Sequence, residues 1–246
     1  MVTPGQTPNG SDGCGFAATH WTVVMAAARG SDSPRAADAL SELCRTYWYP
    51  LYAFLRRRGH ETHEAEDLTQ AFFARLLARD FLANIDRKKG KFRAFLLASL
   101  KHFLSDEKDR ASTQKRGAGR PVVSLDSLDA EARYRLEPAH DLSPEKLYEK
   151  QWALSVLELV LSRLHGEWAT AGKLTLFELL QGTLVGDQTI GYGAIASQLG
   201  MTEGAVKSAA HRLRRRYREL LIAEISQTVA ETDEVESEIR YLMSCL

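Results

Sequence analysis

The sequence predicts an all-α protein: two helical domains joined by a flexible linker, the second domain containing a helix-turn-helix. Apolar residues recur at three- and four-residue steps along most of the chain, which is the period of an amphipathic helix. From Ala17 to about Arg110 no segment alternates apolar and polar residues as a β-strand would. A stretch rich in Gly, Pro, Ser and mixed charge then interrupts the helical pattern, and this break predicts the linker.

The first domain is predicted at 16–111, after a disordered N-terminal tail at 1–15 that is rich in Gly, Pro and polar residues. Three helical stretches follow one another in it. They read "AADALSELCRTYWYPLYAFLRRRG", "HEAEDLTQAFFARLLARDFL" and "KFRAFLLASLKHFLSDEKDR". The third carries a broad apolar face made of Phe92, Phe95, Leu96, Leu100, Phe103 and Leu104.

The linker is predicted at 112–143, with one short helix near Ala130–Arg135. The second domain, 144–226, begins with a strong helix signal, because Ser143 suits an N-cap, Pro144 the first helical position and Glu145 the acidic first turn. A helix should run through "EKLYEKQWALSVLELVLSRLH", and one or two more should precede the turn-rich "GDQTIGYG".

Residues 192–221 predict the helix-turn-helix. Gly200 allows a sharp turn with positive φ, and Thr202 suits the N-cap of a second helix that is rich in Arg. A DNA reader needs this layout, in which a first helix supports a second one whose N-terminal half meets base edges. The alternative interpretation is an amphipathic hairpin with a solvated basic face.

The tail, 227–246, predicts an acidic C-terminal helix with Val235, Ile239, Leu242 and Met243 on one face. Two interpretations stay open. The helix completes the core of the second domain, or its acidic residues mask the basic helix until a partner displaces them.

Composition narrows the class of protein. Formal net charge is zero, with 32 basic and 32 acidic residues, so local basic clusters matter more than the total. No apolar run reaches the roughly 20 residues that a bilayer span needs, and no signal peptide is evident, which predicts a cytoplasmic protein without a membrane partner.

No metal, cofactor or catalytic site is predicted. His60 and His63 are three residues apart, whereas a helical zinc motif spaces its two His by four, and the three Cys are scattered. The chain has no P-loop, nucleophile elbow or dinucleotide fingerprint, so the sequence predicts that the protein is not an enzyme.

Three motifs in order resemble the extracytoplasmic-function (ECF) sigma factors of bacterial RNA polymerase. "AEDLTQAFFARL" (65–76) resembles the helix of that family that binds the polymerase clamp. "KFRAFLLASLKHFLSDEKDR" (91–110) resembles the helix for promoter melting and the minus-ten element. "YGAIASQLGMTEGAVKSAAHRLRRRYREL" resembles the helix-turn-helix that reads the minus-thirty-five element. Other segments and the tail are similar to a long-chain branch with extensions at both ends.

The resemblance implies a sigma factor that directs promoter recognition and DNA melting. Its implied partners are core RNA polymerase and promoter DNA, and an anti-sigma factor is compatible with the resemblance as a further partner. It implies polymerase binding by Glu66, Asp67, Gln70 and Arg75. For the minus-ten DNA we expect Lys101, His102, Lys108, Arg110, Lys115 and Arg116. For the upstream element we expect Thr202, Lys207, Ser208, His211, Arg212 and Arg215.

Aromatic residues between Phe92 and Phe103 offer a further expectation, since they would either hold unstacked bases or belong to the core. The sequence departs from the family at Phe95, His102 and Ala209, where Trp, Asn and Arg are frequent, and in the connection at 166–191. The competing function is a helix-turn-helix regulator that binds DNA without docking on polymerase. Such a regulator would usually dimerise on a palindrome.

Overall fold

The computed structural model describes residues 34–77, 91–113, 127–137, 142–184, 186, 190–229 and 231–246. Within these ranges all regular structure is helical and no strand is present, which confirms the predicted all-α class. The predicted N-terminal tail at 1–15, and the parts of the predicted linker at 114–126 and 138–141, lie outside the described residues.

The described residues of the first half of the chain include the helices α2 (Pro34–Arg57), α3 (Thr62–Leu76) and α5 (Phe92–Thr113). Their apolar faces meet through aromatic rings. The rings of Tyr47 in α2 and Phe92 in α5 lie edge to face with centroids 5.4 Å apart, and Phe72 in α3 lies 5.9 Å from Phe103 in α5. Phe92 and Phe103 are buried, so these two belong to the core and do not stack on bases, whereas Phe95 is half-buried.

Helix α6 (Ser127–Arg135) lies within the predicted linker, where the sequence predicts a short helix. It is attached to α2. The Glu131 carboxylate accepts hydrogen bonds from the Tyr52 hydroxyl at 2.6 Å and the Arg56 Nε at 3.0 Å. The Arg133 guanidinium lies over the Tyr49 ring, 4.2 Å from its centroid. This part of the linker therefore has a fixed position on the first half of the chain.

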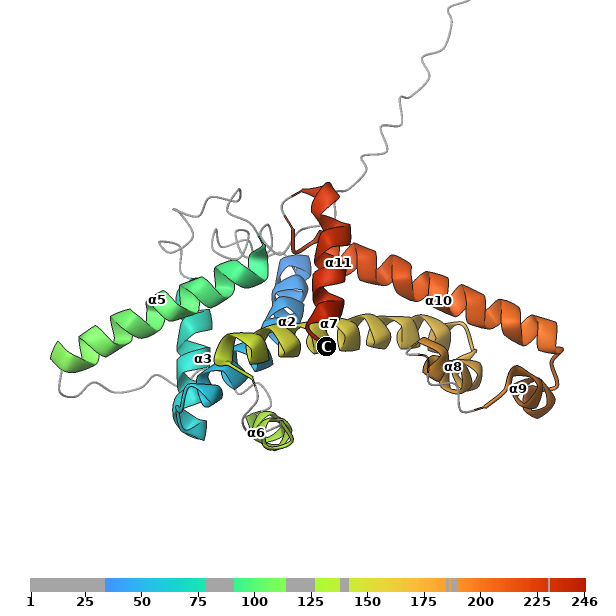
Figure 1. The fold of residues 1–246 in the computed structure, drawn as a ribbon, viewed down its shortest axis with the longest axis horizontal. Coiled ribbons are helices and arrows are strands. Elements are labelled where there is room, and N and C mark those ends of the chain that lie inside the picture. The colour runs from blue at the N-terminus through green and yellow to red at the C-terminus, as the bar shows by residue number, and fades with distance from the viewer. Residues whose placement is uncertain are drawn as a thin grey trace, which may run out of the picture.

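Helix α7 (Pro144–Thr170) forms the centre of the molecule (Figure 1). Ser143 caps it as predicted, since its side chain accepts from the Lys146 amide at 3.3 Å. The helix buries Tyr148 and Trp152, and its contact with α2 is the most extensive between any two described helices. The boundaries of two domains stay a prediction, but the described residues on both sides of the linker share one core through this contact.

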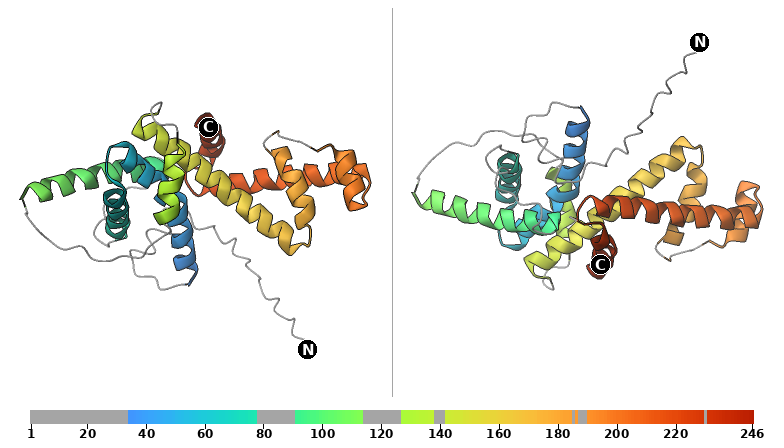
Figure 2. Two further views of the ribbon diagram at one scale, coloured as in Figure 1. Left: turned by 90° about the horizontal axis from the view of Figure 1, so that it is seen from below. Right: turned by 90° about the horizontal axis from the view of Figure 1, so that it is seen from above.

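The segment before the helix-turn-helix forms α8 (Leu174–Leu180) and the 3₁₀ turn η1 (Gln181–Leu184). Then come α9 (Tyr192–Leu199) and α10 (Glu203–Ser226), and α10 runs back along α7. All three views place α5 at one end of the elongated molecule and α9, with the start of α10, at the opposite end (Figures 1 and 2).

The tail forms a 3₁₀ turn, η2 (Thr232–Glu234), and helix α11 (Val235–Ser244). Helix α11 packs on α7 and α10 and buries Val235 and Leu242. Its fully buried Glu238 binds Lys91 at 2.5 Å and Arg93 at 2.6 Å. Helix α11 is held at the centre of the molecule, away from α9 and the start of α10, and this packing favours the core interpretation over masking (Figure 1).

Candidate nucleic-acid interface

Helices α9 and α10 pack on each other and are joined by a tight turn. Gly200 adopts φ 63°, a left-handed conformation that costs glycine little, and the Met201 amide donates to the Ala196 carbonyl at 2.9 Å. The Thr202 side chain then accepts from the Ala205 amide at 3.2 Å and caps α10. The turn and cap signals in the sequence therefore correspond to the local geometry.

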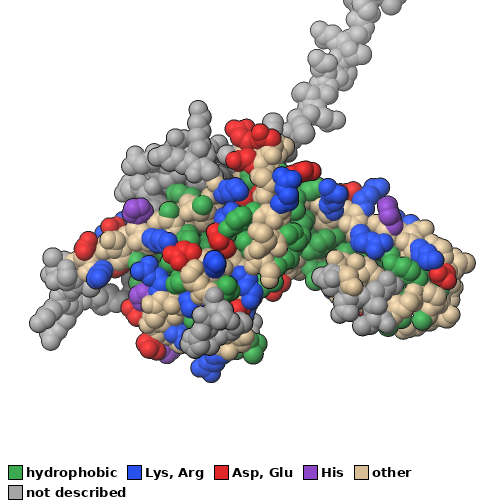
Figure 3. All heavy atoms as spheres, in the orientation of Figure 1, with side chains coloured by type: hydrophobic (Ala, Val, Ile, Leu, Met, Phe, Trp, Pro, Cys, Tyr) green, Lys and Arg blue, Asp and Glu red, His purple; other side chains and the backbone are tan. Residues whose placement is uncertain are grey.

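Five of the six residues expected to meet the upstream element lie on one exposed face of α10. With 3.6 residues per turn, Lys207, Ser208, His211, Arg212 and Arg215 span an arc of about 140°. All five are exposed, and the opposite side of the same turns is buried. Lys and Arg side chains follow α10 along the surface in the space-filling view (Figure 3). The sixth expected residue, Thr202, is exposed but uses its side-chain oxygen for the cap.

Acidic neighbours bind some of these cations. Lys207 binds Glu203 at 2.7 Å, a hydrogen bond that raises the pKa of Lys207, and Arg215 binds Glu219 at 3.1 Å. Arg212 has no acidic partner within the described part of the chain. Of the three expected cations on this face, Arg212 can therefore meet DNA without first breaking an ion pair.

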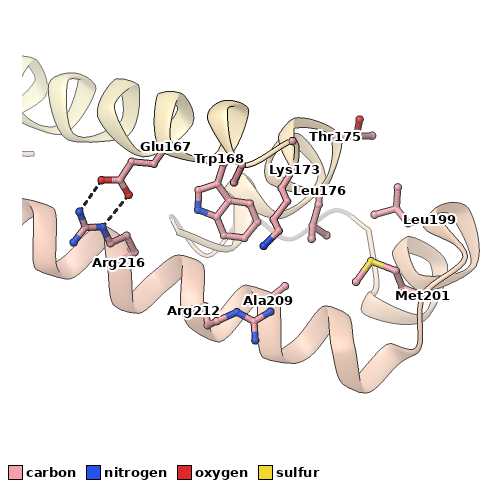
Figure 4. A pocket seen from close by; sticks show the side chains of 12 residues that line it. Glu167, Trp168, Lys173, Thr175, Leu176, Leu199, Met201, Ala209, Arg212 and Arg216 are labelled. Atoms are coloured by element: carbon pink, nitrogen blue, oxygen red, sulfur yellow. Dashed lines mark hydrogen bonds and ion pairs between the residues drawn. The ribbon is translucent and has the colours of Figure 1, made fainter.

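The structure also brings together residues that the sequence did not single out. A hollow of about 600 Å³ lies between the α7–α8 turn and α10 (Figure 4). Trp168 lines it from the end of α7 and Lys173 from the turn that follows, while Ala209, Arg212 and Arg216 line it from α10. Arg216 is held by Glu167 through two bonds of 2.6 and 2.8 Å. No local sequence signal places Lys173 and Arg212 at one hollow, because they line it together only when α7 and α10 pack.

The residues expected at the minus-ten element are spread along α5. Lys101 binds Glu145 at 2.7 Å, a hydrogen bond that lowers the pKa of Glu145 and joins α5 to the start of α7. His102 and Lys108 are exposed, and Arg110 is exposed beside Glu107 at 2.9 Å. The last two expected residues, Lys115 and Arg116, lie outside the described ranges.

The residues expected at the polymerase do not all share one face of α3. Glu66, Asp67 and Gln70 fall within an arc of about 100°. Asp67 is exposed, and Glu66 lies 3.6 Å from His63. Arg75 instead turns toward α5, where it binds Asp106 at 2.6 Å and lies over the Phe103 ring. Arg75 therefore joins α3 to α5 within this chain.

The described ranges contain neither a cluster of residues suited to a metal site nor a membrane-spanning helix. There, no three His, Cys, Asp or Glu side chains gather in a way that could hold a metal ion. Likewise, none of the helices described has the length and apolar character to cross a membrane.

Two comparisons with known proteins agree with the resemblance to sigma factors. Residues 43–113, which run from α2 through α5, match the family Sigma-70 region 2. The chain is 27% identical over 187 residues to the ECF RNA polymerase sigma factor SigE of Mycolicibacterium smegmatis. This alignment covers 76% of the chain and 63% of the relative, so it leaves more than a third of the relative unmatched. No solved structure matches the chain significantly.

Proposed function

We propose, from the premise that this chain is an ECF-type sigma factor, that it directs core RNA polymerase to promoters and assists DNA melting. One observation carries the proposal. Helices α3 and α5, from the segment that matches Sigma-70 region 2, and the exposed basic face of α10 lie toward opposite ends of one molecule (Figure 1). One chain thus has two separate surfaces for two separate DNA elements.

Polymerase docking is assigned to the exposed side of α3 around Asp67. Glu66, Asp67 and Gln70 lie on this side, while Phe72 and Leu76 face the core. A surface of this kind suits a basic partner, and charge complementarity raises both the rate and the specificity of association. Arg75 acts as a structural residue in this scheme, because Asp106 already binds it.

Promoter binding is assigned to two basic surfaces. At the upstream element, α10 enters the major groove with Arg212 as the base-reading candidate, since Arg pairs well with guanine edges. At the minus-ten element, His102, Lys108 and Arg110 are exposed on α5. Lys101 contributes there only after it releases Glu145. Phosphate contacts at both surfaces make the affinity depend strongly on salt.

Run-off transcription with core polymerase on a library of promoters tests this proposal. Wild type should give specific start sites, and Arg212→Ala should weaken the complex by about 1–3 kcal/mol at promoters with one particular upstream base. Arg240→Ala, an exposed cation on α11, is the matched control and should leave transcription unchanged.

The competing regulator predicts a different result. It would bind DNA without core polymerase, give no start sites and form a dimer on a palindrome. DNA binding that is equally tight with and without core polymerase, with no transcript, would favour the regulator. If mutating the α10 face left the upstream footprint unchanged, the assignment of that helix would be wrong.

A further inference from the structure

We propose that the turn between α7 and α8 is an additional DNA contact, in which Lys173 binds a backbone phosphate beside the groove entered by α10. The inference rests on the proposed function and extends its upstream site to an element outside the helix-turn-helix. Three features of the structure support it: the rigid turn, the shared hollow and the position of Arg212.

The backbone of the turn is fixed by hydrogen bonds. Gly172 has φ 67°, its amide donates to the Ala169 carbonyl at 3.0 Å, and the Lys173 amide donates to the Trp168 carbonyl at 2.9 Å. This pair of bonds is the Schellman motif, which ends a helix with a defined change of direction. Lys173 therefore leaves the end of α7 from a fixed position, with the Trp168 ring beside it (Figure 4).

The hollow combines positive charge with apolar walls. Trp168, Leu176 and Met201 supply apolar surface, while Ala209 supplies a methyl group and no charge. Lys173 extends from the turn toward α10, and Arg212 lies on α10 at the same hollow (Figure 4). Within the described residues neither of these two cations has an acidic partner, unlike Arg216, which Glu167 holds. Two such cations at one hollow create a positive potential that an anion would neutralise.

A DNA phosphate is the anion that best fits this position. Arg212 belongs both to the hollow and to the exposed face that is proposed to enter the major groove. Phosphates border the major groove on both sides, and elements next to a reading helix commonly contact them and fix its register. A phosphate between Lys173 and the start of α10 would hold the reading helix in one orientation.

The test compares Lys173→Ala with wild type, each bound to core polymerase on a promoter duplex found by the run-off assay. Ethylation interference identifies the backbone phosphates that the protein needs for binding to the duplex. Ethylation of at least one phosphate should block DNA binding by wild type but no longer weaken DNA binding by Lys173→Ala. The slope of log affinity against log salt should become shallower by about 0.9, the value for one phosphate. The loss of affinity should be the same factor on every promoter, because phosphates carry no sequence information directly.

Lys146→Ala is the matched control, since Lys146 is an exposed lysine in the first turn of α7, at the end of that helix opposite to Lys173. It should keep the wild-type slope and interference pattern. If wild type with core forms no promoter complex, the proposed function itself fails. If the complex forms and Lys173→Ala keeps both the slope and the pattern, the phosphate contact is wrong and the function stands. The contact is also wrong if the variant keeps its DNA affinity while inorganic phosphate quenches Trp168 fluorescence in wild type only, because the hollow then holds a small anion.

Discussion

Arg93 shows how a charged residue is accommodated in the core of this protein. Its guanidinium lies over the rings of Trp152 and Tyr241, and its Nε binds the Glu238 carboxylate at 2.6 Å. The Tyr148 hydroxyl donates to the Arg93 carbonyl at 2.9 Å. A buried charge is tolerated only when it is paired and hydrogen-bonded, so Arg93 depends on Glu238 from the other end of the chain.

We expect Glu238→Ala to lower the free energy of unfolding by about 3 kcal/mol, because the change leaves the buried Arg93 with only its longer ion pair to Glu149 at 3.3 Å. Urea unfolding followed by circular dichroism measures the loss. Glu236→Ala, an exposed acid on the same helix, is the control and should stay within about 0.5 kcal/mol of wild type. Equal stability of the two variants would show that the ion pair contributes no net stability.

The ionised carboxylate of Glu131 makes the attachment of α6 to α2 dependent on pH. Burial by itself raises the pKa of Glu131, but hydrogen bonds from Arg56 and Tyr52 outweigh it and bring the pKa from 4.5 down to about 2. A carboxyl whose pKa is lower in the folded state stabilises the fold above its unfolded pKa. This stability should be lost as pH falls from about 4.5 to about 2.

Glu131→Gln should therefore be less stable than wild type at neutral pH, and the difference should shrink through this pH window. Denaturant unfolding of both proteins at a series of pH values measures the difference. Glu158→Gln is a suitable control, because Glu158 is exposed and binds Arg133 at 3.3 Å. A difference for Glu131→Gln that did not change with pH would contradict the role of its ionised form.

At the scale of elements, α3 and α10 each have a buried apolar side and an exposed charged side. In α3 the buried side holds Phe72 and Leu76, and the exposed side holds Asp67. In α10 the buried side holds Val206 and Leu213, and the exposed side is basic. Surface charges of this kind can be changed with little effect on the fold, which makes them good probes of partner binding.

Asp67→Arg should weaken binding to core polymerase while the melting temperature stays close to wild type. The reason is that the change places a positive charge on the surface proposed to meet a basic partner. Co-purification with core polymerase and a titration of labelled protein measure the effect. Glu178→Arg, an equal charge reversal at an exposed position on α8, should bind like wild type. Unchanged affinity of Asp67→Arg would remove α3 from the polymerase interface.

For the whole molecule, the contact between α2 and α7 determines how the two halves unfold. Tyr47, Leu51 and Leu55 are buried in α2, and Tyr148, Trp152 and Val156 are buried in α7. The two helices pack along each other, although the predicted linker separates them in the sequence. Neither half can unfold without exposing the apolar face of the other.

We therefore expect a single cooperative unfolding transition. Trp152→Ala should lower the free energy of unfolding by about 3–5 kcal/mol and shift all of that transition, since the lost ring leaves a cavity in the shared core. Differential scanning calorimetry, together with circular dichroism and tryptophan fluorescence, measures this. Two separate transitions, only one of them shifted by the substitution, would instead support domains that unfold independently.

The sequence by itself determined the helical class and the local ends of several helices. Ser143 caps α7, and Gly200 and Thr202 end α9 and begin α10, because turns and caps depend on bonds between residues a few positions apart. The exposed basic face of α10 also followed from the sequence, since helical periodicity fixes which residues share a side. The match to Sigma-70 region 2 agrees with the resemblance of the first two motifs.

Only the tertiary structure decided which faces meet. It placed α6 on α2, turned Arg75 toward Asp106 and brought Lys173 and Arg212 to one hollow. It also put the tail in the core, where Glu238 binds Arg93 at a separation of 145 residues. Periodicity shows that a helix has an apolar face but not which partner covers it. The choice of partner depends on the packing and charge pairing of the whole chain, and no local pattern records these.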